Sequence, residues 1–410
     1  MHTNFKAFIL TIVFWLLILS SPLESLGIDI GYIDELFVIL LLPLLFRKNV
    51  FSKRSPRIWS YIVIFLIISF INSIYSEYFR GIELTILDLF LFLKPILFIL
   101  TYIQISKKVR SKFLEYISYP GAIYIYLAFV FYIINIYYNM FTPHDIRFGL
   151  NAYSFIAANP GEFLNNLVLI GLAIYKNQKM KLRNINLVFI AFLLLTTLRF
   201  KAFVILIGTI LLLYFFRNYN KRISNGLSFI KTNIYYFFHK YKIKIYAILG
   251  LALITGWSQF NLYFLKDLTP RLLLVNTSLQ LGLKYFPFGV GAGTFGSAVA
   301  HLWYSPVYVD QGFRNYYGMA SEGTTNFLND NFWPMVYAQY GLIGIVLIIL
   351  IYSKLLFWLS KNIIFEKYNL EIYLIIVFSI VISTVGSSIL IGSLGILHLM
   401  ILGAVINPKK

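Results

Sequence analysis

Residues 185–216 read INLVFIAFLLLTTLRFKAFVILIGTILLLYFF, an apolar stretch that two basic residues interrupt. The stretch is either one very long helix or two short helices that turn back at Leu198-Arg199-Phe200-Lys201. Short cytoplasmic loops of membrane proteins carry an excess of Lys and Arg. The basic loops of this chain alternate on one side of a membrane only if this stretch is a hairpin of two helices. The sequence therefore predicts a hairpin, and the hairpin sets the topology of the whole chain.

The composition indicates a membrane protein. Of the 410 residues, 59% are hydrophobic and 12% are charged, whereas a soluble domain carries about 25% charged residues. The mean hydropathy is +0.77. The net charge of +19 is spread over loops between apolar segments, which indicates membrane topology rather than nucleic-acid binding. The chain has no Cys, and its five His are scattered, which excludes disulfides and argues against a zinc site.

Segment lengths predict the architecture, because a helix needs about 20 apolar residues to cross a bilayer. We expect an all-α, polytopic membrane protein of about twelve transmembrane helices with both termini in the cytoplasm. Residues 1–410 are read as a single integral membrane domain, in which residues 265–332 form one large outward-facing loop. The predicted spans are 5–21, 28–46, 58–75, 83–103, 117–139, 162–176, 185–198, 202–216, 243–264, 333–353, 370–386 and 388–406.

The two halves of the predicted hairpin are short. Residues 185–198 and 202–216 would each reach only about 21–22 Å, whereas the hydrocarbon core is about 30 Å thick. Arg199 and Lys201 should therefore lie below the outer surface, where a bare charge costs from ~2.5 to more than 10 kcal/mol. The pair either snorkels to anchor a short hairpin or forms a recessed anion site that is open to the outside. We favour the anion site.

A second charge lies within an apolar segment. Lys94 is about 17 Å along its predicted helix and precedes Pro95. A buried ammonium needs a counter-ion. We expect Lys94 to pair with Asp34, Glu35 or Asp88.

The predicted outer side carries further cations. Arg147 lies in the loop at 140–161 and Arg271 in the large loop. The planar fork of Arg binds two phosphate oxygens at once, so these residues and Arg199 are candidates for a phosphate site. The sequence does not establish that they converge, and contact with lipid headgroups is the alternative.

The large loop contains a glycine-rich stretch, Pro287–Gly296, and many aromatic residues. We expect Gly289, Gly291 and Gly293 to let the backbone turn sharply beside a helix end or a ligand. A dinucleotide site is dismissed because no strand precedes the stretch. The aromatic residues could pack on sugar faces or form an interfacial belt, and five of them lie far from any predicted span and fit the belt poorly. They are Trp303, Tyr304, Tyr308, Tyr316 and Tyr317.

With these motifs in place, the chain resembles the superfamily of O-antigen polymerases (Wzy-type) and O-antigen ligases. The likeness in layout covers most of the chain, and four places carry it. They are Arg147-x-Gly149 with Pro160, Leu198-Arg199, the stretch from Phe288 to Phe295, and the segment from Asp330 to Gly344.

The resemblance implies a GT-C-like fold and metal-independent glycosyl transfer, without a cofactor, from a polyprenyl (undecaprenyl) diphosphate-linked donor. It implies that Arg147, Arg199 and Arg271 hold the diphosphate, with Lys201 beside Arg199. Because the leaving group is a diphosphate, cations can supply much of the catalysis, and Arg199 is counted as catalytic.

An acceptor hydroxyl needs a base. The candidates are Asp330, His301 and Glu322, and we rank Asp330 first. Asp330 could instead be, or also be, the N-cap of a helix that starts at Phe332. Ligases of the superfamily tend to have His-Asn where this chain has Asp330-Asn331, which favours a polymerase.

The first reading of function is therefore a polymerase that joins lipid-linked oligosaccharide repeat units into O-antigen or capsular polysaccharide. We expect it in a bacterial cytoplasmic (inner) membrane, acting at the outer face on donor and acceptor glycans. The bilayer and a chain-length regulator are its expected partners, and nucleic acid is not. An O-antigen ligase is the alternative enzyme. A lipid-linked oligosaccharide flippase is the alternative from another class, although we find no pseudo-repeat of the kind many transporters show.

The topology generates a test that uses the absence of Cys. A single cysteine at Ser228, in the basic loop at 217–244, should not react with an impermeant maleimide in intact cells. A cysteine at Ser321, in the large loop, should react. Labelling at Ser228 without permeabilisation would refute the twelve-span topology.

Overall fold

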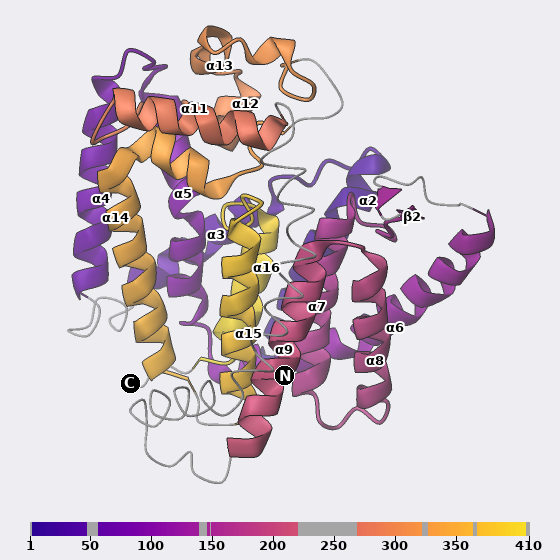
Figure 1. Ribbon diagram of the computed structural model, residues 1–410. Helices are drawn as coiled ribbons and strands as arrows, with labels where there is room; N and C mark the ends of the chain where they lie inside the picture. The colour runs from indigo at the N-terminus through magenta and orange to yellow at the C-terminus, as the bar shows by residue number, and fades with distance from the viewer. Residues whose placement is uncertain are drawn as a thin grey trace. The chain divides into compact units, whose positions relative to one another are not determined.

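The computed structural model describes residues 2–46, 56–138, 146–147, 149–219, 269–321, 327–363 and 367–406. These residues are mostly α-helical (Figure 1), which confirms the helical part of the predicted fold class. The strands within them are two short segments, β1 (Ile146–Arg147) and β2 (Leu150–Asn151), which pair antiparallel. The chain divides into two compact units. Unit 1 comprises Met1–Gly31, Lys108–Leu262 and Ile364–Ser379; unit 2 comprises Tyr32–Lys107, Tyr263–Ile363 and Ile380–Lys410.

Unit 1 is a group of helices around an aromatic core. Tyr153, Phe155 and Phe163 pack against one another in this core. Each is less than a tenth exposed, so they hold the segment after β2 against the start of α7. The helices of unit 1 are α1 (His2–Ile18), α2 (Ser20–Ser25), α6 (Lys107–Tyr138), α7 (Pro160–Lys176), α8 (Arg183–Thr196), α9 (Phe200–Tyr219) and most of α15 (Lys367–Thr384).

The predicted hairpin is confirmed. Helix α8 ends at Thr196, and α9 begins at Phe200. The chain turns through Leu198, whose φ of 50° lies in the left-handed region. An apolar run of this length breaks here because a left-handed residue cannot continue an α-helix.

One helix of unit 2 lies across the ends of longer helices of the same unit. In Figure 1, α11 (Pro270–Lys284) lies across α4 (Pro56–Ile74), α5 (Ile82–Tyr102) and α14 (Phe332–Lys361), with two short helices beyond it. The remaining elements of unit 2 are α3 (Ile33–Leu41), η1 (Leu42–Phe46), α12 (Ala298–Leu302), α13 (Pro306–Asp310), η4 (Phe313–Asn315) and α16 (Ser393–Ala404).

Three described helices are long and apolar enough to cross a membrane, as judged by length and composition. They are α5, α6 and α14. Six further helices contain shorter apolar stretches, of between 10 and 17 residues. These helices indicate that the chain is a membrane protein. The predicted span at 243–264 lies outside the described residues, and a count of twelve spans stays a prediction, as does the single integral domain.

The large loop is folded where the structure describes it. Its helices begin at side-chain caps: Thr269 Oγ1 accepts from Leu272 N at 3.3 Å, and Ser297 Oγ accepts from Ala300 N at 3.2 Å. The loop also contributes apolar residues to a buried core, which includes Phe295, Phe313 and Tyr308. The predicted outward-facing loop is therefore a small structured element at the ends of α4, α5 and α14.

Lys94 has the counter-ions that its burial predicted. Its Nζ lies 2.6 Å from Asp34 Oδ2 and also donates to Glu35 Oε1. The side chains of Lys94 and Asp34 are almost completely buried. The two carboxyl groups come from adjacent residues in the first turn of α3, so the ion pair joins α3 to the middle of α5. The prediction of a counter-ion among Asp34, Glu35 and Asp88 is confirmed for the first two.

Lys94→Met should strongly destabilise the protein, because it leaves the buried Asp34 carboxyl and the partly buried Glu35 carboxyl without a cation. Breaking a buried pair from one side costs about 3–5 kcal/mol. The matched control is Lys284→Met, since Lys284 pairs with Glu77 on the surface with both side chains more than half exposed. Exposed pairs contribute about 0–1 kcal/mol. Thermal unfolding of the purified protein in detergent compares the two. A loss of melting temperature for Lys94→Met no larger than for Lys284→Met would contradict the structural role of the pair.

Candidate functional site

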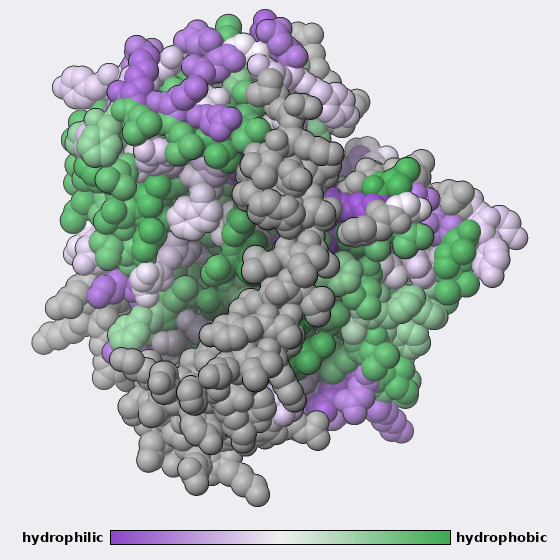
Figure 2. Space-filling model, viewed as in Figure 1, coloured by the Kyte–Doolittle hydropathy of each residue, from purple (hydrophilic) through white to green (hydrophobic). Residues whose placement is uncertain are grey.

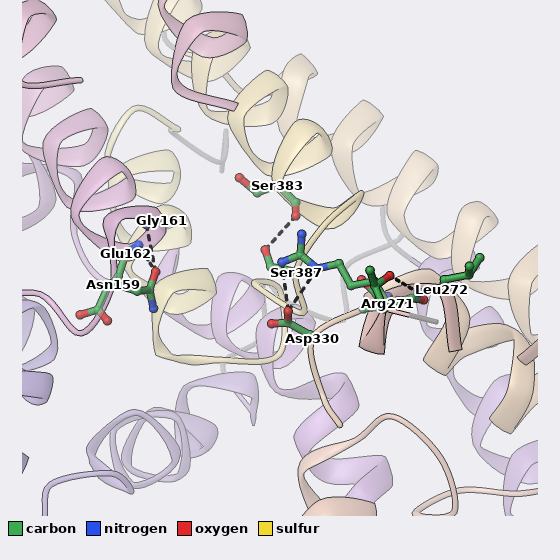
Figure 3. Close-up of polar contacts among 10 residues, drawn as sticks. Asn159, Gly161, Glu162, Arg271, Leu272, Asp330, Ser383 and Ser387 are labelled. Carbon is green, nitrogen blue, oxygen red and sulfur yellow. Dashed lines mark hydrogen bonds and ion pairs between the residues drawn. The ribbon is translucent and has the colours of Figure 1, made fainter. Parts of the chain in front are cut away.

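An arginine and an aspartate meet where two helices of unit 2 begin. Arg271 is the second residue of α11, and Asp330 precedes α14 by two residues. The guanidinium donates twice to one carboxylate oxygen, Asp330 Oδ2, from Nε at 3.2 Å and from Nη2 at 3.0 Å (Figure 3). The side chains are 23% and 31% exposed. The sequence predicts Arg271 as a phosphate ligand and Asp330 as a base on separate grounds. The structure brings these two side chains into direct contact.

The alternative reading of Asp330, as the N-cap of α14, is wrong. Helix α14 does start at Phe332, but its N-cap is Asn331, whose side chain makes no capping hydrogen bond. The Asp330 carboxylate faces Arg271 instead. Two charge-assisted hydrogen bonds from a guanidinium are stronger than a single bond from a backbone amide, so the ion pair takes the carboxylate.

Small residues lie beside the Arg271 guanidinium. A Cβ added at Gly386, in the turn between α15 and α16, would come 4.0 Å from Arg271 Nη1. The next residue, Ser387, directs its hydroxyl to Ser383 O at 2.8 Å (Figure 3). The turn therefore presents no bulky side chain at position 386 to the cation.

The glycine-rich stretch closes a break in helix α14. Gly341 has non-helical angles, with φ 59° and ψ −162°, in the middle of this helix. The break frees two carbonyl oxygens, which accept hydrogen bonds from the loop: Val290 N to Ala338 O at 2.8 Å and Gly291 N to Gln339 O at 2.9 Å. In return Ile343 N donates to Pro287 O at 3.2 Å. The loop and the broken helix therefore satisfy each other's backbone hydrogen-bonding groups.

This contact explains the predicted glycines. Gly289, Gly291 and Gly293 have φ of 81°, 94° and 74°. Residues that carry a side chain disfavour this backbone conformation. A Cβ on Gly289 would lie 2.5 Å from Ala338 O, and one on Gly341 would lie 2.3 Å from Pro287 O. The prediction of sharp turns beside a helix end or a ligand is confirmed, and what Gly289 approaches is the break in α14.

Several polar residues that support this loop were not among the sequence candidates. Asn72 Nδ2 donates to Phe288 O and Gly289 O at 3.2 Å each, and Ser76 Oγ donates to Val290 O at 2.6 Å. Asp88 is buried in α5, where it accepts from Tyr340 Oη at 3.1 Å and is also bonded by Ser297 and the amide of Gly293. The sequence signal for Asp88 is an acidic residue in an apolar helix. That signal predicts only a possible partner for Lys94.

The other loop candidates lie in the folded element above α5. His301 is in α12 and half-buried, and burial lowers the pKa of its imidazole, which favours the neutral form. Tyr308 is completely buried, and its hydroxyl accepts from Gly296 N at 2.7 Å. Tyr308 is thus a core residue and not a platform for sugars, whereas Trp303 and Tyr317 are exposed. Glu322 lies outside the described residues.

The remaining predicted cations are in unit 1. Arg147 is buried in β1, while Arg199 and Lys201 at the hairpin tip are partly buried. Tyr153 N donates to Thr196 O at 3.1 Å, so the segment after β2 rests against the hairpin tip. Unit 1 therefore brings together the two segments that carry Arg147 and Arg199.

No protein-family model matches this sequence, and no curated protein matches it. Within the described ranges, no three His, Asp or Glu side chains gather in the way that a metal site needs.

The ion pair should be measurable as a coupling. Arg271→Ala and Asp330→Ala should each lower the melting temperature slightly, and the double variant should lose less than the sum, since the pair is lost only once. A partly exposed pair of this kind contributes on the order of 1 kcal/mol. The reversed pair, Arg271→Asp with Asp330→Arg, should recover part of the loss. Additive losses, or a reversed pair as unstable as the worse single reversal, would show that the two side chains do not interact in solution.

Proposed function

We propose that this chain is a polysaccharide polymerase of the bacterial cytoplasmic membrane. In this proposal it joins polyprenyl-diphosphate-linked oligosaccharide repeat units into O-antigen or capsular polysaccharide at the outer face. It has about twelve spans, a GT-C-like fold and cytoplasmic termini. The resemblance of its motifs to O-antigen polymerases suggests this function, and the Arg271–Asp330 pair is the observation that carries it.

The pair fits glycosyl transfer because the reaction needs both of its charges. An acceptor hydroxyl oxygen attacks the anomeric carbon of the donor, and the bond from that carbon to the diphosphate oxygen breaks. The hydroxyl proton passes to a base, which is Asp330 in this proposal. The electron pair leaves with the diphosphate, whose charge a guanidinium can stabilise.

The contact between the two residues also suggests an order of events. In the resting protein, Arg271 neutralises Asp330. A diphosphate oxygen competes for the same donors, because a guanidinium binds phosphate in the same forked geometry as carboxylate. Donor binding then draws Arg271 toward the leaving group and frees the Asp330 carboxylate to accept a proton. The base becomes available only when the donor is present.

Unit 1 has cations of its own that are candidates for binding a phosphate group. Arg199 and Lys201 stand at the turn between two short helices, and Arg147 belongs to the segment packed on that turn. Side chains of this charge are costly at membrane depth unless water or an anion is near. Arginine side chains at such a turn are chemically suited to bind a phosphate group.

Contacts within each unit support the proposed topology. In unit 1, Ser21 Oγ donates to Glu162 at 2.9–3.0 Å, and these residues belong to segments both predicted to face outward. In unit 2, Asn72 and Ser76 at the end of α4 bind the large loop. At the opposite ends, Ile363 pairs with Ile406, and both follow helices predicted to end in the cytoplasm. Each contact joins segments that the twelve-span topology places on the same side.

The test is the surface glycan of a strain that lacks this protein, resolved on a gel. Loss of a polymerase should leave single repeat units on the final acceptor, because flipping and ligation continue. Loss of a ligase would leave long chains on the carrier lipid, and loss of a flippase would leave single units on the cytoplasmic face. Either of those results would overturn the proposal.

Variants of Arg199 refine the same test. Arg199→Ala should reproduce the deletion while the protein remains in the membrane, and Arg199→Lys should also be poor, because a lysine lacks the bidentate fork.

Asp330→Asn should lose much of the activity, since general base catalysis contributes about 100- to 10,000-fold. Lys284→Met, which changes a surface charge of the same loop, should leave normal chains. Normal polymer from Arg199→Ala would remove the anion site from the proposal.

A further inference from the structure

Helix α11 exposes two different stripes of side chains. Its buried face consists of Leu273, Leu274, Thr277, Ser278, Leu281 and Gly282. On the exposed side, Leu279, Leu283 and then Phe286 follow one another at intervals of four and three residues. This spacing is that of one helical stripe.

The neighbouring exposed stripe is polar. Asn276, Gln280 and Lys284 are four residues apart, and all three are exposed. Lys284 pairs with Glu77 at 3.2 Å, which fixes the polar stripe toward the turn between α4 and α5. A helix in water on its outer side would have no reason to divide that side into a polar and an apolar half. A helix lying in a membrane interface does.

The apolar stripe continues into the apolar surface of α4 and α14. Phe288 follows it and is exposed, and its carbonyl is bound by Asn72 near the end of α4. The other side of Phe288 touches α14, since a Cβ on Gly341 would lie 2.6 Å from Phe288 C. Exposed apolar residues run along both helices from this point: Val63, Ile64, Ile67, Ile71 and Ile74 on α4, and Leu342, Val346 and Ile349 on α14.

The surface of unit 2 has the same division. Figure 2 shows hydrophobic residues along α4 and α14 and hydrophilic ones gathered at the end that carries α12 and α13. Helix α11 lies at the boundary between the two regions (Figure 1). Its two stripes are therefore arranged as the boundary requires.

We infer that α11 and the turn that follows it form an interfacial element, which lies in the plane of the membrane surface with Leu279, Leu283 and Phe286 inserted among bilayer lipids. The sequence predicts only that residues 265–332 form an outward-facing loop. This inference needs only that unit 2 spans a membrane, and it does not depend on the glycan chemistry proposed above. The large loop would then be attached to the lipid as well as to the helices beneath it.

The test uses nitroxide spin labels on single cysteines in the full chain, reconstituted into nanodiscs of phosphatidylethanolamine and phosphatidylglycerol. Labels at Leu279→Cys, Leu283→Cys and Phe286→Cys should collide several-fold more with oxygen than with a water-soluble nickel chelate. The control within the same helix is Gln280→Cys, where the nickel chelate should dominate. The control outside it is Leu302→Cys in α12, because Leu302 is 59% exposed and Leu283 is 69% exposed.

Three results would decide the matter. Lipid-like collisions at the three apolar positions, and water-like collisions at 280 and 302, support the inference. Water-like collisions at all five positions overturn it. Low collision rates with both reagents at 279, 283 and 286 would also overturn it, because they indicate a protein cover such as a second copy of the chain. The three positions are independent variants, each accepted only if it elutes as the unlabelled protein does, and the result is separable from polymerase activity because no glycan is present.

Discussion

A helix that breaks inside a membrane protein leaves backbone groups that have no water to bind, and other parts of the protein must satisfy them. Helix α14 breaks at Gly341, and the arrangement of unit 2 follows from how the break is closed. The loop at 287–291 supplies the missing donors and acceptor. Because that loop must approach the helix backbone closely, it needs glycine at 289, and α14 needs glycine at 341. The ends of α4 and α5 then hold the far side of the loop through Asn72, Ser76 and Asp88.

The candidate site is positioned by the same packing. Helix α11 lies on the first half of α14, where Gly282 faces the ring of Tyr337 so closely that a Cβ would come within 2.4 Å of it. This contact fixes one helix start relative to the other. Arg271 is in the first turn of α11 and Asp330 lies just before α14, so the distance between a cation and a carboxylate is set by helices and not by a flexible loop. Sites on rigid elements are held more precisely than sites on loops.

The features that could be predicted from sequence are those with a local cause. The hairpin was readable because Arg199 and Lys201 interrupt an apolar run, and the counter-ions of Lys94 because a buried charge needs one. The start of α14 at Phe332 was also correct. The helices of the large loop were missed, although Thr269-Pro270 and Ser305-Pro306 are typical helix starts. The alternative that Asp330 caps α14 came from a local feature, whereas the actual partner of its carboxylate, Arg271, is 59 residues away. No local pattern shows that Asp88 meets Tyr340, 252 residues later.

These separations have a consequence for the order in which the protein is made. The ends of α4 and α5 are synthesised more than 200 residues before the loop that binds them. Until the loop arrives, the buried Asp88 and the hydroxyl and amide groups above it have none of these partners, and closing so long a stretch of chain is slow. The break in α14, by contrast, is closed by a loop only about 50 residues earlier. The loop and α14 can therefore assemble as a local subdomain, which then docks on helices already in the membrane. In a nascent chain halted before residue 287, the ends of α4 and α5 would have no loop to bind, and Asn72, Ser76 and Asp88 would lack these hydrogen-bond partners.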